Sequence, residues 1–165
     1  MSITVTTEKQ FESDIEAFLI SAEGGYIKGN GTYNPKLGLY PDKLVSFIQR
    51  TQPREWAAFE RQNDIDPVRK FCVAFNNACD MDGVLHVLRN GFKHRGTTFK
   101  VCYFKPESAL NDIAGIQYAE NEVECYRQWY YFADTKKSVD VVLAVNGIPV
   151  FAFELKKQYT GQNVD

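Results

Sequence analysis

Residues 139–156 read VDVVLAVNGIPVFAFELK, two mainly apolar runs on either side of Asn146-Gly147. Asn-Gly between two such runs is the strongest short-range signal for a β-hairpin. The runs predict strands over residues 139–145 and 148–155. Strands this apolar indicate burial on both faces, so other layers of the protein must cover the hairpin.

Three charged residues interrupt these strands: Asp140, Glu154 and Lys156. A charge inside such a strand is costly unless it is paired or bound to a metal. Two carboxylates and a lysine suit phosphodiester hydrolysis, in which the carboxylates hold Mg²⁺ and the backbone carbonyl of Leu155 adds an oxygen ligand. The metal would lower the pKa of a bound water, and Lys156 would orient that water or stabilise the pentacovalent phosphate. The alternative is a cross-strand ion pair at an exposed hairpin end.

The register of the hairpin tests this metal site. Glu154 and Lys156 are two residues apart, so their side chains leave the same face of a strand. A strict two-residue turn at Asn146-Gly147 would pair Asp140 with Phe153 and put Asp140 and Glu154 on opposite faces. A shared metal ion therefore requires an odd-length loop with a bulge, or another distortion near Asp140 that redirects its side chain. We predict one of these two departures.

The region upstream of the hairpin predicts two more strands and several helices. Residues 97–104 and 123–132 are rich in β-branched and aromatic residues and are expected to be strands. Helices are expected over residues 41–50, 53–63, 67–79 and 84–89, with Pro53 and Pro67 in first turns, where proline is tolerated. A turn is expected at residues 80–83.

The first helix is expected to begin at Thr7, which forms a capping box with Gln10, and to end before Gly24-Gly25. Glu12 would lie at the rim of its apolar face. The residues of that face recur at helical spacing: Phe11, Ile15, Phe18, Leu19 and Ala22.

The expected fold class is therefore α/β, with a helical N-terminal half (mostly residues 7–90) packed on a mixed β-sheet (mostly residues 97–156). The chain has 165 residues, of which 44% are hydrophobic. This is enough for one domain with a sizeable core, whereas two domains would each be small. We expect a single domain over residues 1–165.

Several classes of protein are excluded by composition. No apolar run approaches the roughly 20 residues needed to span a bilayer, and the N-terminus has no apolar signal-peptide core. The four cysteines form no CxxC pair, and the two histidines do not complete a zinc set. The simplest interpretation is a cytoplasmic protein with reduced thiols. No GxxxxGK[ST] motif is present that could bind ATP as a P-loop.

A basic stretch covers residues 86–105, which contain no acidic residue although the net charge of the chain is −2. Such a stretch could face DNA phosphates, could contact a partner subunit, or could be a solvated surface. Its candidate DNA-binding residues are Arg89, Lys93, Arg95 and Lys100.

Several phrases of the sequence resemble the nuclease core of type I restriction enzyme R subunits, which belong to the PD-(D/E)xK nuclease superfamily. As a set they cover nearly the whole chain, and they imply a restriction-endonuclease-like core. They are Thr51-Gln52-Pro53 with Trp56, Leu88-Arg89-Asn90-Gly91-Phe92, Phe104-Lys105-Pro106, Asn121 with Arg127-Gln128, residues 138–143, residues 145–150, residues 153–156 and Thr160-Gly161-Gln162.

The resemblance implies a role for each candidate site residue. Asp140 and Glu154 would be metal ligands, and Lys156 the catalytic lysine. Arg127 and Gln128 would contact DNA or hold the site together.

The first helix would carry a supporting acidic residue at Glu12, with Glu8 and Glu16 as alternatives. The chain departs from the family pattern after the hairpin, because neither Gln158 nor Gln162 has a tyrosine four residues on. A Gln-x-x-x-Tyr element is frequent there in these nucleases. A smaller departure is Val139, which stands where a proline often precedes the aspartate.

The resemblance also implies an activity and partners. The chain would be a type I site-specific deoxyribonuclease domain acting on double-stranded DNA with Mg²⁺, for which Mn²⁺ can substitute. It would be either the N-terminal fragment of a longer R subunit or a truncated gene product, weakly active alone, and ATP would act only through domains absent from it. Modification and specificity subunits would be its partners. The alternatives are a repair-type nuclease of the same superfamily and a non-catalytic DNA-binding or assembly module.

Overall fold

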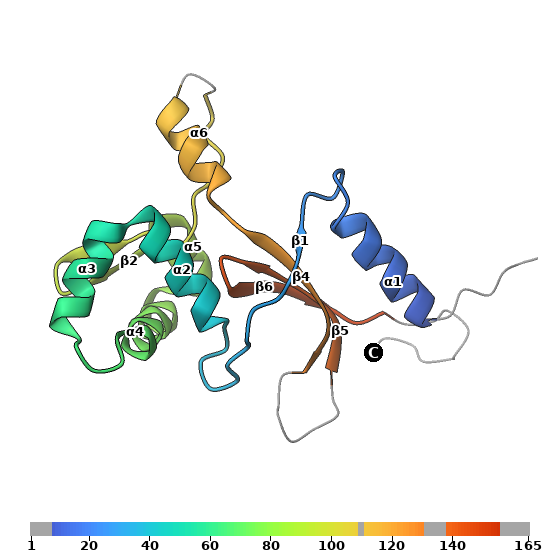
Figure 1. The fold of residues 1–165 in the computed structure, drawn as a ribbon, viewed down its shortest axis with the longest axis horizontal. Coiled ribbons are helices and arrows are strands. Elements are labelled where there is room, and N and C mark those ends of the chain that lie inside the picture. Colours follow the sequence, from blue (N-terminus) through green and yellow to red (C-terminus); the bar gives the residue numbers. More distant parts are fainter. Residues whose placement is uncertain (1–7, 109–110, 131–137, 156–165) are drawn as a thin grey trace, which may run out of the picture. The chain divides into compact units, whose positions relative to one another are not determined.

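A computed structural model describes residues 8–108, 111–130 and 138–155 (Figure 1). The described residues form a four-stranded sheet in the order β1-β4-β5-β6, a two-stranded sheet of β2 and β3, and six helices. This confirms the expected α/β class with a helical N-terminal half. The elements are α1 (Glu8–Leu19), β1 (Ile27–Lys28), α2 (Pro41–Thr51), α3 (Pro53–Gln62), α4 (Pro67–Asp82), α5 (Val84–Asn90), β2 (Phe92–His94), β3 (Thr97–Phe99), α6 (Asp112–Ala119), β4 (Val123–Tyr130), β5 (Ser138–Val145) and β6 (Ile148–Phe153).

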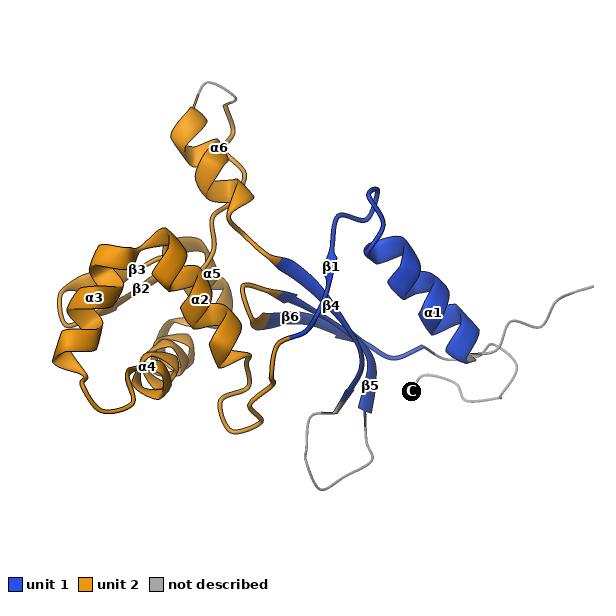
Figure 2. Cartoon of the chain, in the orientation of Figure 1, with its two compact units in different colours: residues 1–30, 123–144, 149–165 blue, residues 31–122, 145–148 orange. Residues whose placement is uncertain are grey.

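The chain divides into two compact units (Figure 2). The first unit, called here the sheet unit, consists of residues 1–30, 123–144 and 149–165. The second, called the helical unit, consists of residues 31–122 and 145–148. The expectation of a single domain stays a prediction.

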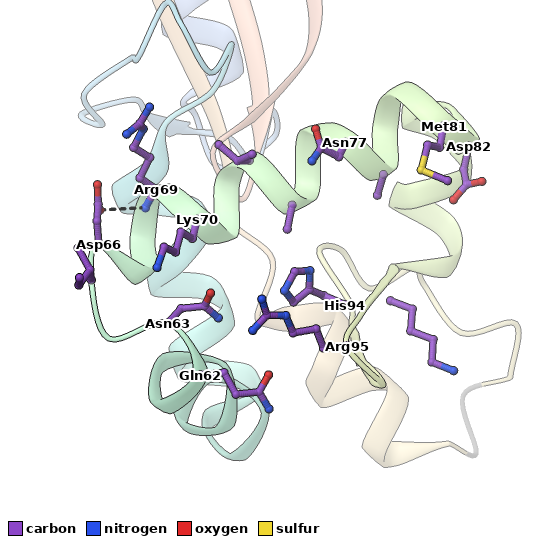
Figure 3. A pocket seen from close by; sticks show the side chains of 15 residues that line it. Gln62, Asn63, Asp66, Arg69, Lys70, Asn77, Met81, Asp82, His94 and Arg95 are labelled. Atoms are coloured by element: carbon purple, nitrogen blue, oxygen red, sulfur yellow. Dashed lines mark hydrogen bonds between the residues drawn. The ribbon is translucent and has the colours of Figure 1, made fainter.

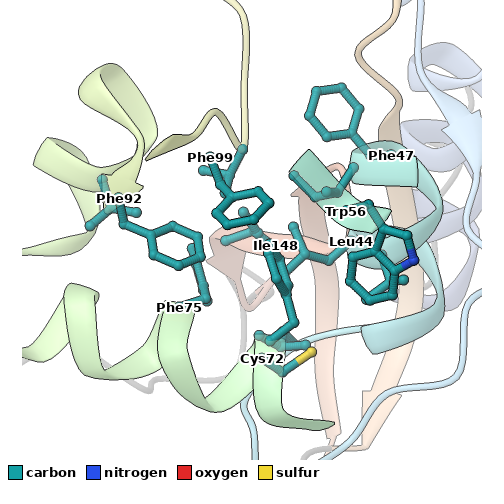
Figure 4. Packing of buried hydrophobic residues seen from close by; sticks show 14 of the residues in the cluster. Leu44, Phe47, Trp56, Cys72, Phe75, Phe92, Phe99 and Ile148 are labelled. Atoms are coloured by element: carbon teal, nitrogen blue, oxygen red, sulfur yellow. The ribbon is translucent and has the colours of Figure 1, made fainter. Parts of the chain in front are cut away.

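An aromatic core holds the helical unit together (Figure 4). Phe71 of α4 is fully buried, and its ring centroid lies 5.0 Å from that of Phe99 and 5.6 Å from that of Trp56. Both contacts are edge-to-face, an arrangement that aromatic quadrupoles favour. Burying one such side chain contributes roughly 1.5–3 kcal/mol. The core therefore fixes α3, α4 and β3 against one another.

The helices of this unit follow the proline and apolar pattern of the sequence. α2, α3 and α4 each have proline in the first turn, as expected. α4 continues through Asp82, so the turn expected at residues 80–83 is wrong. The helix ends instead at Gly83, whose φ of 87° is a conformation that glycine adopts without strain. Gly83 alone therefore separates α4 from α5, in place of the expected four-residue turn.

The strand expected over residues 97–104 is also wrong beyond Phe99. In the segment that follows, two side-chain amides make the backbone hydrogen bonds that a neighbouring strand would otherwise make. Gln52 accepts a bond from the Lys100 N–H (2.8 Å) and donates one to its carbonyl (2.7 Å). Asn121 does the same for Tyr103, at 3.1 and 2.6 Å. The backbone groups of Lys100 and Tyr103 are therefore hydrogen-bonded without a partner strand, and the segment after Phe99 is not part of a sheet.

The Asn146-Gly147 turn belongs to the helical unit. Both residues have positive φ, 50° and 78°, as a two-residue type I′ turn requires. The Asn146 side chain is buried; its Nδ2 donates to the Val101 carbonyl, and its Oδ1 accepts from the Glu122 N–H. The Gly147 carbonyl accepts from the Tyr40 N–H. The turn is therefore an internal anchor of this unit.

The sheet unit contains α1, β1, β4 and most of β5 and β6. β1 pairs with β4 in parallel, with Ile27 opposite Glu124 and Lys28 opposite Cys125. β5 and β6 are antiparallel, since only two residues join them. β4 and β5 are also antiparallel, because the Asn146 N–H after β5 donates to the Glu122 carbonyl just before β4. The sheet is therefore mixed, as expected.

Candidate functional site

Helix α1 turns an acidic face inward. Glu12 and Glu16, one turn apart, are only 4% and 8% exposed, whereas Phe11 and Phe18 are 50% and 58% exposed. The expectation that the aromatic residues form the buried face of this helix is therefore wrong. Carboxylates are rarely buried unless they are paired. Their burial here points to specific partners.

Those partners come from strand β4, which packs against α1. Gln128 Nε2 donates a hydrogen bond to Glu12 Oε2 (2.8 Å). Arg127 Nη1 forms an ion pair with Glu16 Oε2 (3.4 Å), and Lys28 Nζ of β1 forms another with Glu16 Oε1 (3.3 Å). The three predicted supporting residues, Glu12, Arg127 and Gln128, thus meet at one place, together with Glu16. We call these four residues the α1–β4 cluster.

The backbone of Gln128 explains how this cluster forms. In a regular strand Arg127 and Gln128 would point to opposite faces, yet both contact α1. Gln128 has a φ of 54°, a left-handed conformation inside a strand, which we interpret as a β-bulge. A bulge redirects a side chain and breaks the alternation. It thereby brings two consecutive polar side chains onto one helix.

Asp140 of β5 contacts the chain just beyond β6. Its Oδ2 accepts a hydrogen bond from the Leu155 N–H at 2.6 Å. Asp140 is half-buried and Glu154 is exposed. Lys156 lies outside the described residues. The structure therefore brings the Asp140 carboxylate to the backbone that directly follows Glu154.

Two alternative departures from a regular hairpin were expected: an odd-length loop, or a distortion near Asp140. The odd-length loop is wrong, because the turn has two residues in the type I′ conformation. β6 ends at Phe153, the residue that strict pairing places opposite Asp140, so Glu154 and Leu155 lie beyond the last strand residue. The second alternative, a distortion that redirects the Asp140 side chain toward Glu154, stays a prediction.

The donor atoms at this end of the hairpin are chemically suited to Mg²⁺. Asp140 and Glu154 supply carboxylate oxygens and Leu155 a backbone carbonyl, all of the hard oxygen type. Asp140 Oδ1 takes part in no hydrogen bond among the described residues, whereas Oδ2 is bonded to Leu155. Within residues 8–108, 111–130 and 138–155, no three His, Cys, Asp or Glu side chains form a metal-binding group. The assignment of ligands stays a prediction.

The thiol of Cys125 lies in the same electrostatic environment as Glu16. Burial, followed by the negative charge of Glu16, raises its pKa, while Lys28 and Arg127 act in the opposite direction. The thiol is therefore protonated at neutral pH and is a poor nucleophile there. Cys125 offers no alternative catalytic group.

The candidate DNA-binding residues all lie in the helical unit. Arg89 is in the last turn of α5, and Lys100 donates to the Asn90 carbonyl at 2.9 Å, which gives it a structural role. Lys93 and Arg95 are exposed and line a groove beside α4. Lys93 and Arg95 thus share one groove, whereas Lys100 is engaged by the backbone of Asn90, and the role of these residues in DNA binding stays a prediction.

Two features of the site escaped the sequence reasoning: the bulge at Gln128 and the ion pair of Lys28 with Glu16. The adjacent polar residues Arg127-Gln128 inside a predicted strand carried a signal, because alternation normally puts one of them into an apolar layer. Fully buried Glu124 of β4 was also missed. Its neighbours in sequence do not distinguish it from a surface residue.

The comparisons with known proteins give one match. The family model described as Type I restriction enzyme R protein N terminus matches residues 49–165. Neither the curated proteins nor the solved structures give a match. Among the described residues, no helix has the length and apolar character needed to cross a membrane.

Proposed function

The chain belongs to the family of type I restriction enzyme R protein N termini, and we propose that it is the DNA-cleaving domain of such a subunit, hydrolysing phosphodiester bonds with Mg²⁺. Asp140, Glu154 and Lys156 carry the reaction in this proposal. A restriction complex and DNA are the setting that the family indicates.

One observation supports this assignment above the others: the 2.6 Å bond from the Leu155 N–H to Asp140 Oδ2. Leu155 is the residue between Glu154 and Lys156, so the bond joins the aspartate strand to the Glu-x-Lys segment. Residues fifteen apart in the sequence meet at this point. The bond thus places the Asp140 carboxylate beside the Glu-x-Lys segment, as a shared metal site would require.

The proposed mechanism gives each residue of the hairpin end a separate task. Asp140, Glu154 and the Leu155 carbonyl would hold the Mg²⁺, which when bound supplies an activated water and neutralises phosphate charge. Lys156 would orient the water and stabilise the developing negative charge. The Leu155 N–H fixes the Asp140 carboxylate, so that Oδ1 stays available as a ligand.

The α1–β4 cluster supports the site from the next strand. Glu122 and Asn146 are joined by a backbone bond, and Gln128 and Asp140 each lie six residues from it along antiparallel strands. Regular pairing from that bond would bring residue 128 level with residue 140. In our proposal Glu12, bonded to Gln128, adds negative charge beside the metal, and Arg127 contacts the DNA backbone.

The substrate in this proposal is double-stranded DNA. Sequence recognition would come from specificity and modification subunits, and ATP would act on a motor outside this chain. Mn²⁺ should replace Mg²⁺, because both ions accept octahedral oxygen ligands. A repair-type nuclease would use the same residues and differ in its partners.

A non-catalytic assembly module is the second candidate, and the same bond favours it. Asp140 satisfies the Leu155 N–H as the strand ends, which is a structural role that requires no metal. In this case the Asp140 carboxylate is needed for folding alone.

Metal binding separates the two candidates. Mn²⁺ titration by calorimetry should show one site in the full chain and loss of that site in Glu154→Gln, which has the same size without the charge. Asp80→Asn, an exposed carboxylate of α4, is the matched control and should bind normally. Equal Mn²⁺ binding in all three proteins would favour the module.

Cleavage of supercoiled plasmid provides the second measurement. Lys156→Met should keep Mn²⁺ binding and lower the cleavage rate by on the order of 100-fold, as expected when a group that stabilises transition-state charge is removed. Unchanged cleavage in Lys156→Met and Glu154→Gln would contradict the proposed active site.

A further inference from the structure

The helical unit contains a groove of about 780 Å³ beside α4 (Figure 3). One side is the exposed face of α4, from Arg69 to Asp82. The end of α3 contributes Gln62 and Asn63, and the β2–β3 hairpin contributes Lys93, His94 and Arg95. Figure 3 shows Gln62, Asn63, His94 and Arg95 approaching the space below α4 from these elements.

The α4 side of the groove carries an apolar strip, although Arg69, Lys70, Asn77 and Asp82 of the same helix also line it. Ala74, Ala78 and Met81 line it at helical spacing, with Val73 beside them. Met81 is 83% exposed, and Ile65, which also lines the groove, is 73% exposed. Ile65, Val73 and Met81 are the exposed members of this lining, whereas Ala74 and Ala78 are partly buried against the core. Exposed apolar side chains gathered in one groove mark a binding surface more often than a solvated one.

Cations flank this apolar strip. Lys70 projects from α4 toward Asn63 (Figure 3), and Lys93 and Arg95 of the hairpin also line the groove. With Arg69 the lining holds four cations, against the two carboxylates of Asp66 and Asp82. Asp66 accepts the Arg69 backbone N–H as the cap of α4, so it is already engaged. None of the four cations forms an ion pair with another described residue, and the groove is positive on balance.

His94 adds a neutral polar group to the wall. Burial, followed by the charge of Arg95, lowers its pKa, so its imidazole is uncharged at neutral pH. Together with the amides of Gln62, Asn63 and Asn77 it offers hydrogen bonds without further charge. The positive charge therefore comes from lysine and arginine, which stay charged throughout the physiological range.

We propose that this groove binds an acidic amphipathic helix of a partner protein. Such a helix places apolar side chains on the Val73–Met81 strip and carboxylates opposite Lys70, Lys93 and Arg95, a recognised mode of helix-in-groove binding. α4 has 16 residues, and at 1.5 Å per residue it is about 24 Å long, enough to align with several turns of a partner. The inference is independent of the metal site.

A DNA backbone fits this groove less well. Phosphates find no partner in Ile65 and Met81, and the carboxylates of Asp66 and Asp82 repel them. Only a ligand that carries both apolar groups and negative charges makes use of all the lining residues. The two ligands are therefore distinguishable by substitution.

The test is selection of a phage-displayed library of peptides about 16 residues long on the full chain. Enriched peptides should combine Leu, Ile or Phe at helical spacing with Glu and Asp. Met81→Gln, which removes apolar contact without changing charge, and Lys93→Met, which removes charge, should each weaken binding of the selected peptides by about tenfold.

Two exposed residues outside the groove lining provide matched controls. Leu85→Gln and Lys36→Met should leave the affinity unchanged, with folding of every variant checked by circular dichroism. The proposal is overturned if no acidic amphipathic sequence is enriched, or if the groove and control variants bind equally. It is also overturned if a short DNA duplex displaces the peptides and is weakened by Lys93→Met but unaffected by Met81→Gln, since that pattern identifies a phosphate site.

Discussion

Buried polar side chains, rather than apolar ones, position the candidate active site. Glu12 is placed by one hydrogen bond from Gln128, and Asp140 is placed by one from the Leu155 N–H. In each pair, loss of one partner leaves the other without its bond, which typically costs about 1–3 kcal/mol. The bulge at Gln128 is the local feature on which the first pair depends, because it turns this side chain toward α1.

The bulge makes a prediction about residue 128 itself. Gln128→Ala and Gln128→Gly both lose the bond to Glu12, but only glycine adopts a φ of 54° without strain. The glycine variant should therefore be the more stable of the two by about 1 kcal/mol. Urea unfolding of both variants measures the difference.

Val150 in β6 is the control position, since it is exposed and does not have a positive φ. There the ordinary order should hold, with alanine more stable than glycine. The same order at both positions would show that Gln128 does not need its left-handed conformation.

Individual helices and strands were predictable where the local sequence signals were strong. Prolines and apolar periodicity identified α2, α3, α4 and α5, and Asn146-Gly147 identified the hairpin. β1, β2 and α6 were not predicted: the two strands have two and three residues, too few for a periodic pattern, and α6 has no buried residue.

The first helix shows why the site was harder to predict than the fold. Its aromatic residues indicated one buried face, whereas the structure buries Glu12 and Glu16 instead. The partners of these carboxylates lie more than 100 residues away in sequence, so no local pattern reveals them. The type of element was predictable, but its orientation depends on tertiary contacts.

The close approach of the hairpin turn to Tyr40 leads to a prediction about Gly147. A Cβ at Gly147 would lie 2.6 Å from the Tyr40 carbonyl oxygen, and the φ of this residue is 78°. Gly147→Ala should therefore destabilise the protein by more than the roughly 1–3 kcal/mol cost of the backbone conformation alone. Guanidinium unfolding measures the loss.

Gly38 allows the two contributions to be separated. Its φ is 68°, yet nothing lies within 4 Å of the position of its Cβ. Gly38→Ala should show the conformational cost only. If Gly147→Ala is no more destabilising than Gly38→Ala, the turn is not anchored against Tyr40.

At the scale of the whole molecule, the two units contain different chemistry. The sheet unit holds the candidate active site, and the helical unit holds the aromatic core and the positive groove. The family assignment covers residues 49–165 and therefore parts of both. The proposed cleavage activity and the proposed helix binding should therefore be separable, with Glu154→Gln affecting only the first and Met81→Gln only the second.

The buried thiols make overall stability depend on pH. Burial, followed by the charge of Asp66, raises the pKa of Cys72 to about 12 from an ordinary value of 9.0. The unfolded chain therefore releases this proton first as the pH rises, and the folded state retains it. The stability from this group is complete below about pH 9 and is lost as the pH rises toward 12.

Unfolding midpoints in urea, measured from neutral to alkaline pH, test this dependence. The midpoint of the native chain should fall more steeply above pH 9 than that of Cys72→Ala, which has no thiol to ionise at this position. Parallel curves would show that Cys72 is not protected by burial.

Metal binding at the open end of the hairpin can be measured by the paramagnetic broadening that Mn²⁺ causes in the backbone amide signals of the isotopically labelled chain. If Asp140 and Glu154 share a metal ion, substoichiometric Mn²⁺ should broaden the signals of Asp140, Glu154 and Leu155 together, and Glu154→Gln should abolish this effect. The shared metal site would be contradicted if the amide signals of Asp140 and Glu154 stayed sharp while those of other Asp and Glu residues broadened.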